Sequence, residues 1–328
     1  MEIMKKIIFL LAISAFAFTA QAKVWRVNNN ATMNANFASF VAAQSTVSPN
    51  DTLYFEGSTV SYGNIVLTKP LVIIGPGYFL EENPQTQSNY ITAKFGTIGF
   101  TTGSSGSILA GLVVQDNITI NVSNISITKC NTGSILLNSV TASVGDVLLL
   151  QNYIKGQLYD NGSNTIFNLI ISNNYIFNGF YGTPISFETT TSGTISNNVF
   201  EGNLNVSNFT ITNNILTSGS LTQNNNVFYK NICNGIQFPI GNGNQQNTIM
   251  SGVFVGTTGN STDGQWQLKE YSPAIGKGND GTDCGMFGGS SPYVLSGLPS
   301  IPAIYEIDMP ATGDNINGID VTIKAKTH

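Results

Sequence analysis

Residues 171–176 read Ile-Ser-Asn-Asn-Tyr-Ile, and residues 195–200 repeat the form as Ile-Ser-Asn-Asn-Val-Phe. In both places a polar corner is followed by a short apolar pair. The same form recurs along the chain, and its last polar position falls at residues 130, 152, 174, 198 and 214, in steps of 22, 22, 24 and 16. A repeat of this length with short apolar runs and Asn/Gly turns predicts the coils of a parallel β-solenoid.

Asparagine at one position of every coil is expected to have a structural role. Stacked coils lie about 4.8 Å apart, so each side-chain amide can bond to the one above and form a ladder. Asn also tolerates the left-handed backbone of a sharp corner. We expect this ladder to contain Asn152, Asn174, Asn198 and Asn214, with weaker continuations at 225–228 and 247–249.

The competing fold is an antiparallel sandwich with hairpins every 8–12 residues. The repeat is about twice that long and keeps one order of corner, apolar pair and glycine, which favours the solenoid. The sequence therefore predicts an all-β, single-stranded parallel β-helix.

The composition disfavours several classes of protein. Charged residues make up 9% of the chain and the formal net charge is −5, whereas binding to nucleic acid needs clustered Lys and Arg. We expect no nucleic-acid partner. Arg26 is the only arginine and His328 the only histidine, so triads and zinc sites that need histidine are disfavoured. The 40 asparagines and the 41% hydrophobic content indicate a folded, Asn-rich β scaffold.

Residues 1–22 have the organisation of a secretory signal peptide. Lys5 and Lys6 precede an apolar run of 12 residues, Ile7 to Phe18, and residues 20–22 (Ala-Gln-Ala) fit the cleavage rule. The run is shorter than the roughly 20 residues that span a bilayer, which favours cleavage before Lys23 over a membrane anchor. We therefore expect an exported protein, periplasmic, cell-surface or extracellular, with no transmembrane segment after cleavage.

The solenoid is expected to occupy residues 23–290, with covers at both ends because open strand edges must be protected. Residues 34–47 place Phe37, Phe40, Val41 and Val47 near one face at helical spacing, which predicts an N-terminal capping helix. Residues 291–328 are expected to form a short C-terminal β appendage, a hairpin of 303–309 and 318–325 that packs over the last coil.

Cys130, Cys233 and Cys284 are widely spaced and lack a CxxC motif, so a metal site is disfavoured. Three buried free thiols are one interpretation, and one disulfide with a free thiol is the other.

Aspartates near the C-terminal end raise the question of calcium, which prefers several oxygen ligands. Asp263-Gly264, Asp280-Gly281 and Asp283 match the spacing of neither an EF-hand nor the nine-residue calcium repeat. We interpret them as turns and expect no metal and no cofactor, with Ca²⁺ as the weaker alternative.

Short segments at both ends of the predicted solenoid carry a resemblance: 51–55 and 69–75 near its start, 272–276 and 283–287 near its end, and 292–297 with the tail. They resemble the first and final coils of secreted right-handed parallel β-helix proteins of the pectate-lyase-like type, and the last segment with the tail resembles members of the Bacteroidota type. The resemblance covers most of the mature chain but is specific only at its ends. It implies a right-handed helix and a protein that acts on or binds acidic polysaccharides, although a fold alone does not define a function.

Lyases of this type use a basic residue to remove the proton α to a uronate carboxylate, which cations neutralise. Lys129, Lys155 and Lys230 are the only cations between residues 100 and 260. Lys155 lies three residues after one ladder position and Glu201 three residues after another, two coils apart. We expect roughly 10 Å between them along the stack, too far for a direct hydrogen-bonded acid–base pair.

Glycoside hydrolysis needs two carboxyl groups about 5–9.5 Å apart. Asp160, Glu188 and Glu201 are the candidates in the middle of the solenoid, and each is isolated in sequence. With Lys155 they are the catalytic candidates of an enzyme hypothesis, which predicts that all four side chains converge in one groove. Solvated surface residues are the alternative interpretation.

Tyrosines supply a candidate binding site for sugars. Tyr159 and Tyr181 lie six residues after Tyr153 and Tyr175, so the same face repeats in two coils. Exposed rings there could stack on the apolar faces of sugars, and the alternative is an internal or corner stack.

These observations favour an exported, non-catalytic β-helix scaffold at the cell envelope or outside the cell, with polysaccharide as its expected partner. A purely structural or adhesive surface protein remains open. The alternative from a different class is a polysaccharide lyase or glycoside hydrolase acting on acidic glycans.

Overall fold

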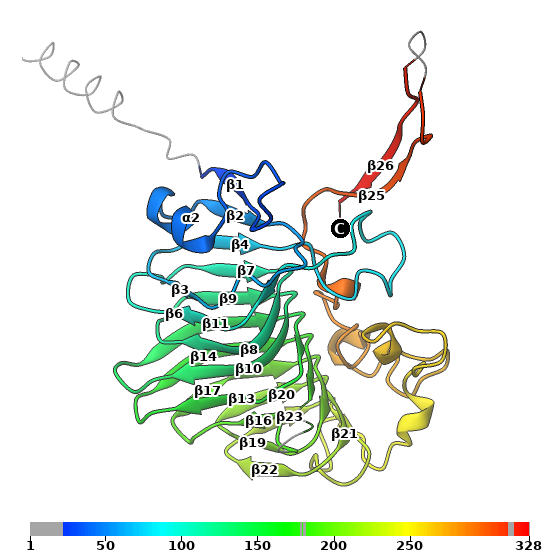
Figure 1. Cartoon of the computed structure of the whole chain (residues 1–328). Helices are drawn as coiled ribbons and strands as arrows, with labels where there is room; N and C mark the ends of the chain where they lie inside the picture. Colours follow the sequence, from blue (N-terminus) through cyan, green and yellow to red (C-terminus); the bar gives the residue numbers. More distant parts are fainter. Residues whose placement is uncertain (1–21, 178, 180–181, 314–317, 328) are drawn as a thin grey trace, which may run out of the picture.

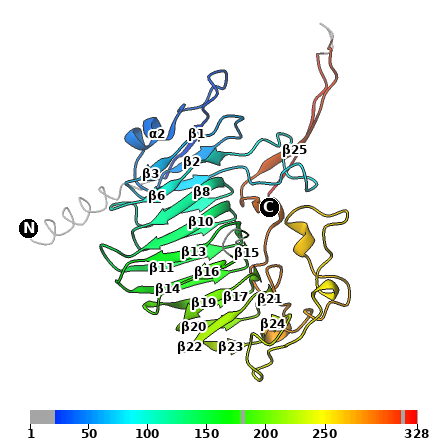
Figure 2. The same ribbon diagram turned by 60° about the horizontal axis from the view of Figure 1, so that its bottom comes forward.

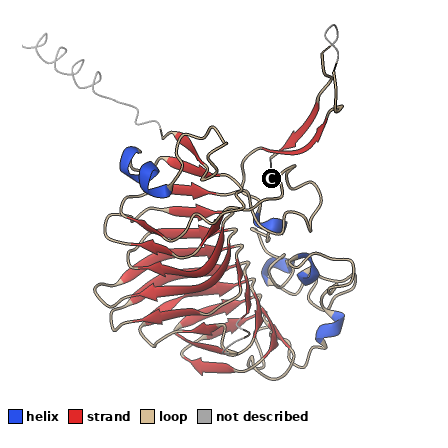
Figure 3. Cartoon of the chain, in the orientation of Figure 1, coloured by secondary structure: helices blue, strands red, loops and turns tan. Residues whose placement is uncertain are grey.

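Short apolar strands stack in register along most of the chain and form a coiled ribbon (Figures 1 and 3). The computed structural model describes residues 22–177, 179, 182–313 and 318–327. The predicted signal peptide, apart from Ala22, lies outside these residues. No helix in the described part of the chain is long and apolar enough to cross a membrane.

One face of the coil is a ten-stranded sheet in which every strand is parallel to its neighbours. Each strand belongs to a successive coil. In spatial order the strands are β1 (Val24–Val27), β2 (Thr52–Phe55), β4 (Val72–Ile74), β7 (Ile108–Ala110), β9 (Ile125–Thr128), β11 (Val144–Leu150), β14 (Ile166–Ser172), β17 (Thr191–Ser196), β20 (Phe209–Thr212) and β23 (Val227–Tyr229).

The rest of the coil surface is a 14-stranded parallel sheet that divides in two at β10 (Asn131–Asn138). The start of β10 pairs with one branch and its end with the other. The first branch is β12 (Tyr153–Ile154), β15 (Tyr175–Phe177), β18 (Val199–Glu201), β21 (Ile215–Ser218) and β24 (Ile232–Cys233). The second is β13 (Leu158–Asn161), β16 (Ile185–Ser186), β19 (Leu204–Ser207) and β22 (Leu221–Asn224), and β3 (Ile65–Leu67), β5 (Lys94–Phe95), β6 (Ile98–Phe100) and β8 (Val113–Ile120) precede β10.

Each later coil therefore has three strands, one in the first sheet and one in each branch (Figure 2). Parallel strands with crossover connections are right-handed in nearly all proteins. The fold is a right-handed parallel β-helix, as predicted, and the antiparallel sandwich is excluded because all ladders in both sheets are parallel.

The core consists of inward side chains that stack from coil to coil. One column is formed by residues directly paired in the first sheet. Its members are at most 6% exposed, and full burial of one such side chain contributes about 1.5–3 kcal/mol. The column contains Ile127, Leu149, Ile171, Ile195, Ile211 and Phe228.

A short helix covers the N-terminal end, as predicted, but it is shorter than the expected range of 34–47. Helix α2 spans Phe40–Thr46, because the Ser39 hydroxyl accepts a hydrogen bond from the Ala42 amide and caps it there. Phe40 and Val47 are buried. The spacing also placed Val41 on the buried face. That prediction is wrong, because Val41 is 76% exposed.

The chain beyond the last coil returns along the side of the solenoid towards its first coils (Figures 1 and 2). Residues 250–302, here called the return segment, contain the 3-10 turns Met250–Gly252, Gly264–Trp266, Asn279–Gly281 and Leu295–Gly297. The segments resembling a final coil, 272–276 and 283–287, form no strand of either sheet and lie in this return segment instead. The segments resembling first coils contain β2 and β4.

The chain ends in an antiparallel hairpin of β25 (Ala303–Asp308) and β26 (Thr322–Lys326). The expectation that it packs over the last coil is wrong. The Ser88 amide donates to the Ile304 oxygen at 2.8 Å, which fixes the hairpin beside the early coils, and it projects from the end that carries β1 (Figure 1). Phe238, fully buried against Phe228, closes the other end.

Candidate functional site

The asparagine row is a continuous ladder inside the corner between the first sheet and the first branch. The Asn174 side-chain oxygen accepts from the Asn152 amide at 2.8 Å and from Asn152 Nδ2 at 3.0 Å. Asn198 and Asn214 repeat the arrangement, and the ladder continues to Asn231. These four predicted residues are fully buried, and their amides are already bonded within the protein, so the row offers no ligand site.

The left-handed corner residue is the one before each ladder asparagine, not the ladder residue itself. Gln151, Asn173, Asn197 and Asn213 have φ between 55° and 59°. Their side chains turn outward and hold the return segment: Gln151 Nε2 donates to the Pro292 oxygen at 2.7 Å. The two adjacent asparagines of the repeat thus have different structural roles: the first contacts the return segment and the second forms the ladder. Only the role in the ladder was predicted.

An aromatic stack lies beneath the return segment. Tyr153 and Tyr175 stack with ring centroids 4.6 Å apart, and Trp266 stacks on Tyr175 at 4.6 Å. Both tyrosines are at most 6% exposed. Burial raises the pKa of the Tyr153 phenol to about 12, so these rings form an internal surface rather than one that meets a sugar.

Glu201 lies at the end of β18 beside this stack. The Tyr175 hydroxyl donates to its Oε1 at 2.8 Å. Loss of water around the carboxyl raises the pKa of Glu201, and the hydrogen bond from Tyr175 opposes that rise only in part.

Asp160 lies in the other branch, on β13, and binds the chain of the next coil. Its carboxylate accepts from the Glu188 amide at 3.0 Å and from the Thr191 hydroxyl. Burial raises the pKa of Asp160. The hydrogen bonds from Thr191 and from the Glu188 amide oppose that rise, and the charge of Glu188 adds to it. The structure therefore brings Asp160 to the main chain of Glu188, whose own side chain is exposed.

Lys155 and Glu201 belong to one branch but are separated along the stack. Ile154 pairs with Ile176, and Phe177 pairs with Glu201, so Lys155 is two strands from Glu201, about 10 Å at ordinary strand spacing. Lys155 is exposed. The ion pairs within the described residues are Arg26–Glu56 and Lys324–Glu306, and neither includes a catalytic candidate.

Tyr159 is half-buried on the outer face of β13. Its register partner in the next coil is Ser186, followed by Asn205 and Thr222. Inward neighbours such as Leu158 are buried, so this second set points outward because side chains alternate along a strand. Tyr181, its predicted companion, lies outside the described residues.

Three residues of this row, Ser186, Asn205 and Thr222, line an open depression of about 360 Å³ on the second branch, here called the polar depression. Tyr159 precedes them in the row and is not part of the lining. None of the residues that line it is charged. Asn205 Nδ2 donates to the Ser186 hydroxyl at 3.4 Å, and Asn203 Oδ1 accepts from the Ser220 hydroxyl at 3.0 Å. Sequence reasoning did not find this depression, because its amide and hydroxyl residues come from four coils. The polar side chains that line it include Gln157, Ser186, Asn203, Asn205, Ser220 and Thr222.

Cys130 and Cys233 belong to the solenoid core, whereas Cys284 and the C-terminal aspartates belong to the return segment. Cys130, Cys233 and Cys284 are buried free thiols. Asp263 is fully buried and accepts from the Ser296 amide at 2.6 Å. Among the described residues, no group of three His, Cys, Asp or Glu side chains could hold a metal ion.

Comparisons with known proteins include a match to a solved structure. A solved structure titled "Crystal structure of pectate lyase Pel9A" is 12% identical in sequence, with a TM-score of 0.45, over 82% of this chain and 96% of that one. No family model matches the chain, and no curated protein matches it. The assignment to the parallel β-helix class follows from the strand ladders themselves.

Proposed function

We propose that the protein is an exported, non-catalytic β-helix that binds a polysaccharide in the polar depression. The observation that supports this most directly is the outward row of Tyr159, Ser186, Asn205 and Thr222, one residue per coil. Hydroxyl and amide groups can donate to and accept from sugar hydroxyls, and a tyrosine ring can pack on the apolar face of a sugar.

The charge distribution favours a neutral glycan. The depression is lined by uncharged residues, and the chain has a net charge of −5. A polyuronate would bring carboxylates to a site without a cation, on a surface of the same overall sign, and like charges disfavour association.

The positions of the ionisable candidates support a binding role over a lyase or hydrolase. Asp160 and Glu201 lie in different branches, and each carboxyl is occupied by hydrogen bonds within the protein. A hydrolase needs two carboxyls flanking one bond, and a lyase needs a base next to a neutralised carboxylate. Lys155 is exposed and two strands from Glu201.

A glycan screen on purified residues 23–328 tests the proposal. Binding and the ultraviolet absorbance of unsaturated uronate products should be measured together, with reducing ends as the assay for hydrolysis. We expect binding to a neutral glycan without any product. Product formation would contradict a non-catalytic role, and silence in all channels would favour the structural or adhesive alternative.

Variants locate the site. Asn205→Ala and Thr222→Ala should each weaken binding about 3- to 10-fold, because a lost hydrogen bond contributes about 0.5–1.5 kcal/mol. The matched control is Thr210→Ala, which removes an exposed outward threonine from β20 in the first sheet. Equal affinity of all three variants would place binding elsewhere on the molecule.

A further inference from the structure

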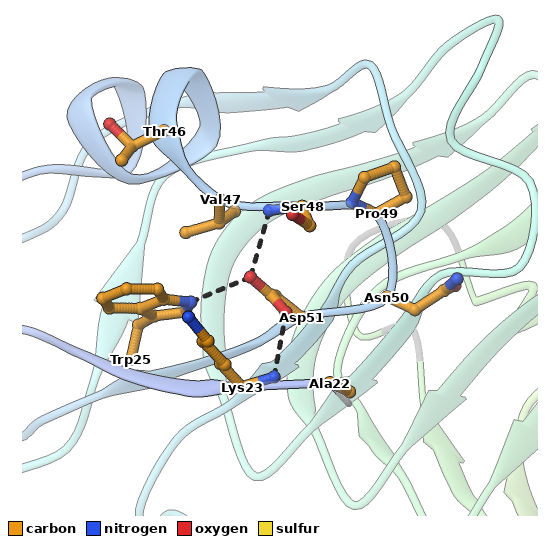
Figure 4. A pocket seen from close by; sticks show the side chains of 9 residues that line it. All are labelled: Ala22, Lys23, Trp25, Thr46, Val47, Ser48, Pro49, Asn50 and Asp51. Atoms are coloured by element: carbon orange, nitrogen blue, oxygen red, sulfur yellow. Dashed lines mark hydrogen bonds between the residues drawn. The ribbon is translucent and has the colours of Figure 1, made fainter. Parts of the chain in front are cut away.

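Asp51, the residue before β2, is a carboxylate withdrawn from water beside the first strand. It is 4% exposed. Its Oδ1 accepts from the Lys23 main-chain nitrogen at 2.9 Å, and its Oδ2 accepts from Trp25 Nε1 at 2.9 Å and from the Ser48 amide at 3.0 Å. Figure 4 shows the three donors converging on this side chain, in a pocket of about 400 Å³.

No side-chain cation within the described residues forms an ion pair with Asp51. Lys23 Nζ lies over the Trp25 ring, 5.7 Å from its centroid. Lys69, on the neighbouring loop, donates to the Val47 oxygen at 2.9 Å. On β1 and beyond β2, Arg26 and Glu56 pair with each other. A carboxylate removed from water is stabilised by a paired charge as well as by hydrogen bonds. Here the Lys23 side-chain ammonium acts on Asp51 only through space, and the hydrogen bonds all come from neutral donors.

The Lys23 nitrogen is the atom that signal-peptide cleavage would change. Ala22 is exposed, whereas Lys23 already belongs to the solenoid, because the Thr52 amide donates to its oxygen at 2.8 Å. The ladder of β1 with β2 begins at the next residue, where Val24 pairs with Thr52. The predicted cleavage site therefore falls at the boundary between exposed and paired chain.

We propose that hydrolysis of the Ala22–Lys23 bond creates an α-ammonium group that Asp51 binds as an ion pair. Water is the co-reactant: its hydroxyl adds to the Ala22 carbonyl carbon, and the Lys23 nitrogen leaves with a proton. The Ala22 carboxylic acid loses its proton and the new amine gains one. One neutral N–H donor thus becomes three donors with a full positive charge, at a nitrogen already 2.9 Å from the carboxylate.

Cleavage of the signal peptide would therefore strengthen a contact within the first coil. In the precursor, which still carries the signal peptide, Asp51 accepts hydrogen bonds from neutral donors only. In the processed chain the α-ammonium group of Lys23 donates to it instead, and β1 does not have to move. The processed protein is therefore the more stable form. Formation of this ion pair does not depend on whether the polar depression binds a glycan.

The test compares two chains made from a fusion whose protease leaves a defined first residue. One begins at Lys23 and the other retains Ala22, which moves the ammonium one residue away. At pH 7 we expect the Lys23 chain to have a Tm higher by about 2–4 °C. An ion pair raises the pKa of an α-amino group above its usual value of about 7.7–8.0. The difference should therefore be present at pH 7 and lost as the pH rises above about 10.

Two substitutions test whether Asp51 causes the difference in Tm. Asp51→Asn should abolish the difference in Tm between the two chains. Asp146→Asn, which alters an exposed carboxylate that binds the Asn168 side chain, should preserve it. A difference that persists in Asp51→Asn, or equal Tm values of the two unmutated chains, would overturn the proposal.

Two further measurements do not depend on folding of the variants. The pH dependence of acylation at the α-amine of the Lys23 chain should report a raised pKa, and an ordinary pKa would overturn the proposal. N-terminal sequencing of the exported protein should find Lys23, and a different first residue would overturn it equally.

Discussion

Asn173 Nδ2 donates a 2.7 Å hydrogen bond to the main-chain oxygen of Gly288, 115 residues further along the chain. The same nitrogen donates to the Met286 oxygen at 3.0 Å. Equivalent contacts occur coil by coil, so that the return segment is held at successive corners. The other contacts are Asn213 with Asn279, Asn197 with Asp283, Gln151 with Ser291 and Pro292, and Lys129 with Ser300.

We expect Asn173→Ala to loosen the return segment while the coils remain folded. The substitution leaves two main-chain oxygens without their donor, at a cost of about 1–3 kcal/mol for each buried group left unbonded. Hydrogen exchange should become faster at residues 285–293 than in the strands. Asn168→Ala, at an exposed corner, is the control and should leave exchange there unchanged. Uniformly faster exchange would contradict a local role.

Substitution of a ladder asparagine should lower the free energy of unfolding more than substitution of a corner residue. Asn174→Ala removes the acceptor of the Asn152 amide and of Asn152 Nδ2, both fully enclosed. The substitution also removes the Asn174 Nδ2 donor to the Leu149, Ser172 and Asn198 oxygens. More buried partners are therefore affected than in Asn173→Ala, and we expect a loss of about 3–6 kcal/mol in the free energy of unfolding. Urea unfolding followed by circular dichroism measures it. A loss below that of Asn173→Ala would contradict this ranking.

Glu201 should oppose folding when it is ionised. Its pKa is raised by burial, so the folded state holds the proton to a higher pH than the unfolded state. Its contribution is therefore most favourable at low pH and declines as the pH rises through its unfolded and then its folded pKa. Glu201→Gln should raise the free energy of unfolding at pH 7 by about 0.5 kcal/mol or less. The effect should vanish near pH 3, and a loss of stability at pH 7 would show that the ionised form is required.

The cysteines should be inert in the native protein. Burial raises the pKa of Cys130 and of Cys284 to about 12, and the thiolate is the reactive form. With iodoacetamide at pH 8, mass spectrometry should find no labelled cysteine in the folded protein and three in the unfolded one. Rapid native labelling of Cys130 would show that the core opens there.

The repeat predicted the coil architecture because each coil buries the same kinds of residue at the same corner. The continuation of the ladder beyond Asn214 was predicted at the wrong residues. Asn231 and Asn244 extend the ladder, whereas Asn226 accepts from the Phe209 amide at a different corner. The motif of two asparagines and two apolar residues occurs at both corners, and local sequence does not distinguish them once the coils shorten.

The return segment and the polar depression are less visible in the sequence because both depend on which distant residues meet. Residues 272–287 read as a coil by resemblance, yet their partners are the corner side chains of earlier coils. Asp160 was a catalytic candidate because it is one of the few acids in the middle of the solenoid. Its hydrogen bonds to Glu188 and Thr191 arise only from the stacking of coils.

The return segment also changes how the protein is expected to unfold. A solenoid whose repeats touch only their neighbours can lose coils independently from either end. Here one continuous stretch of chain contacts corners from Asn213 back to Lys129, and Tyr78 in the early coils shares a 2.6 Å hydrogen bond with Tyr293. Fraying of the last coils must also release contacts at the first. Heat or denaturant should therefore melt the stack in one cooperative transition.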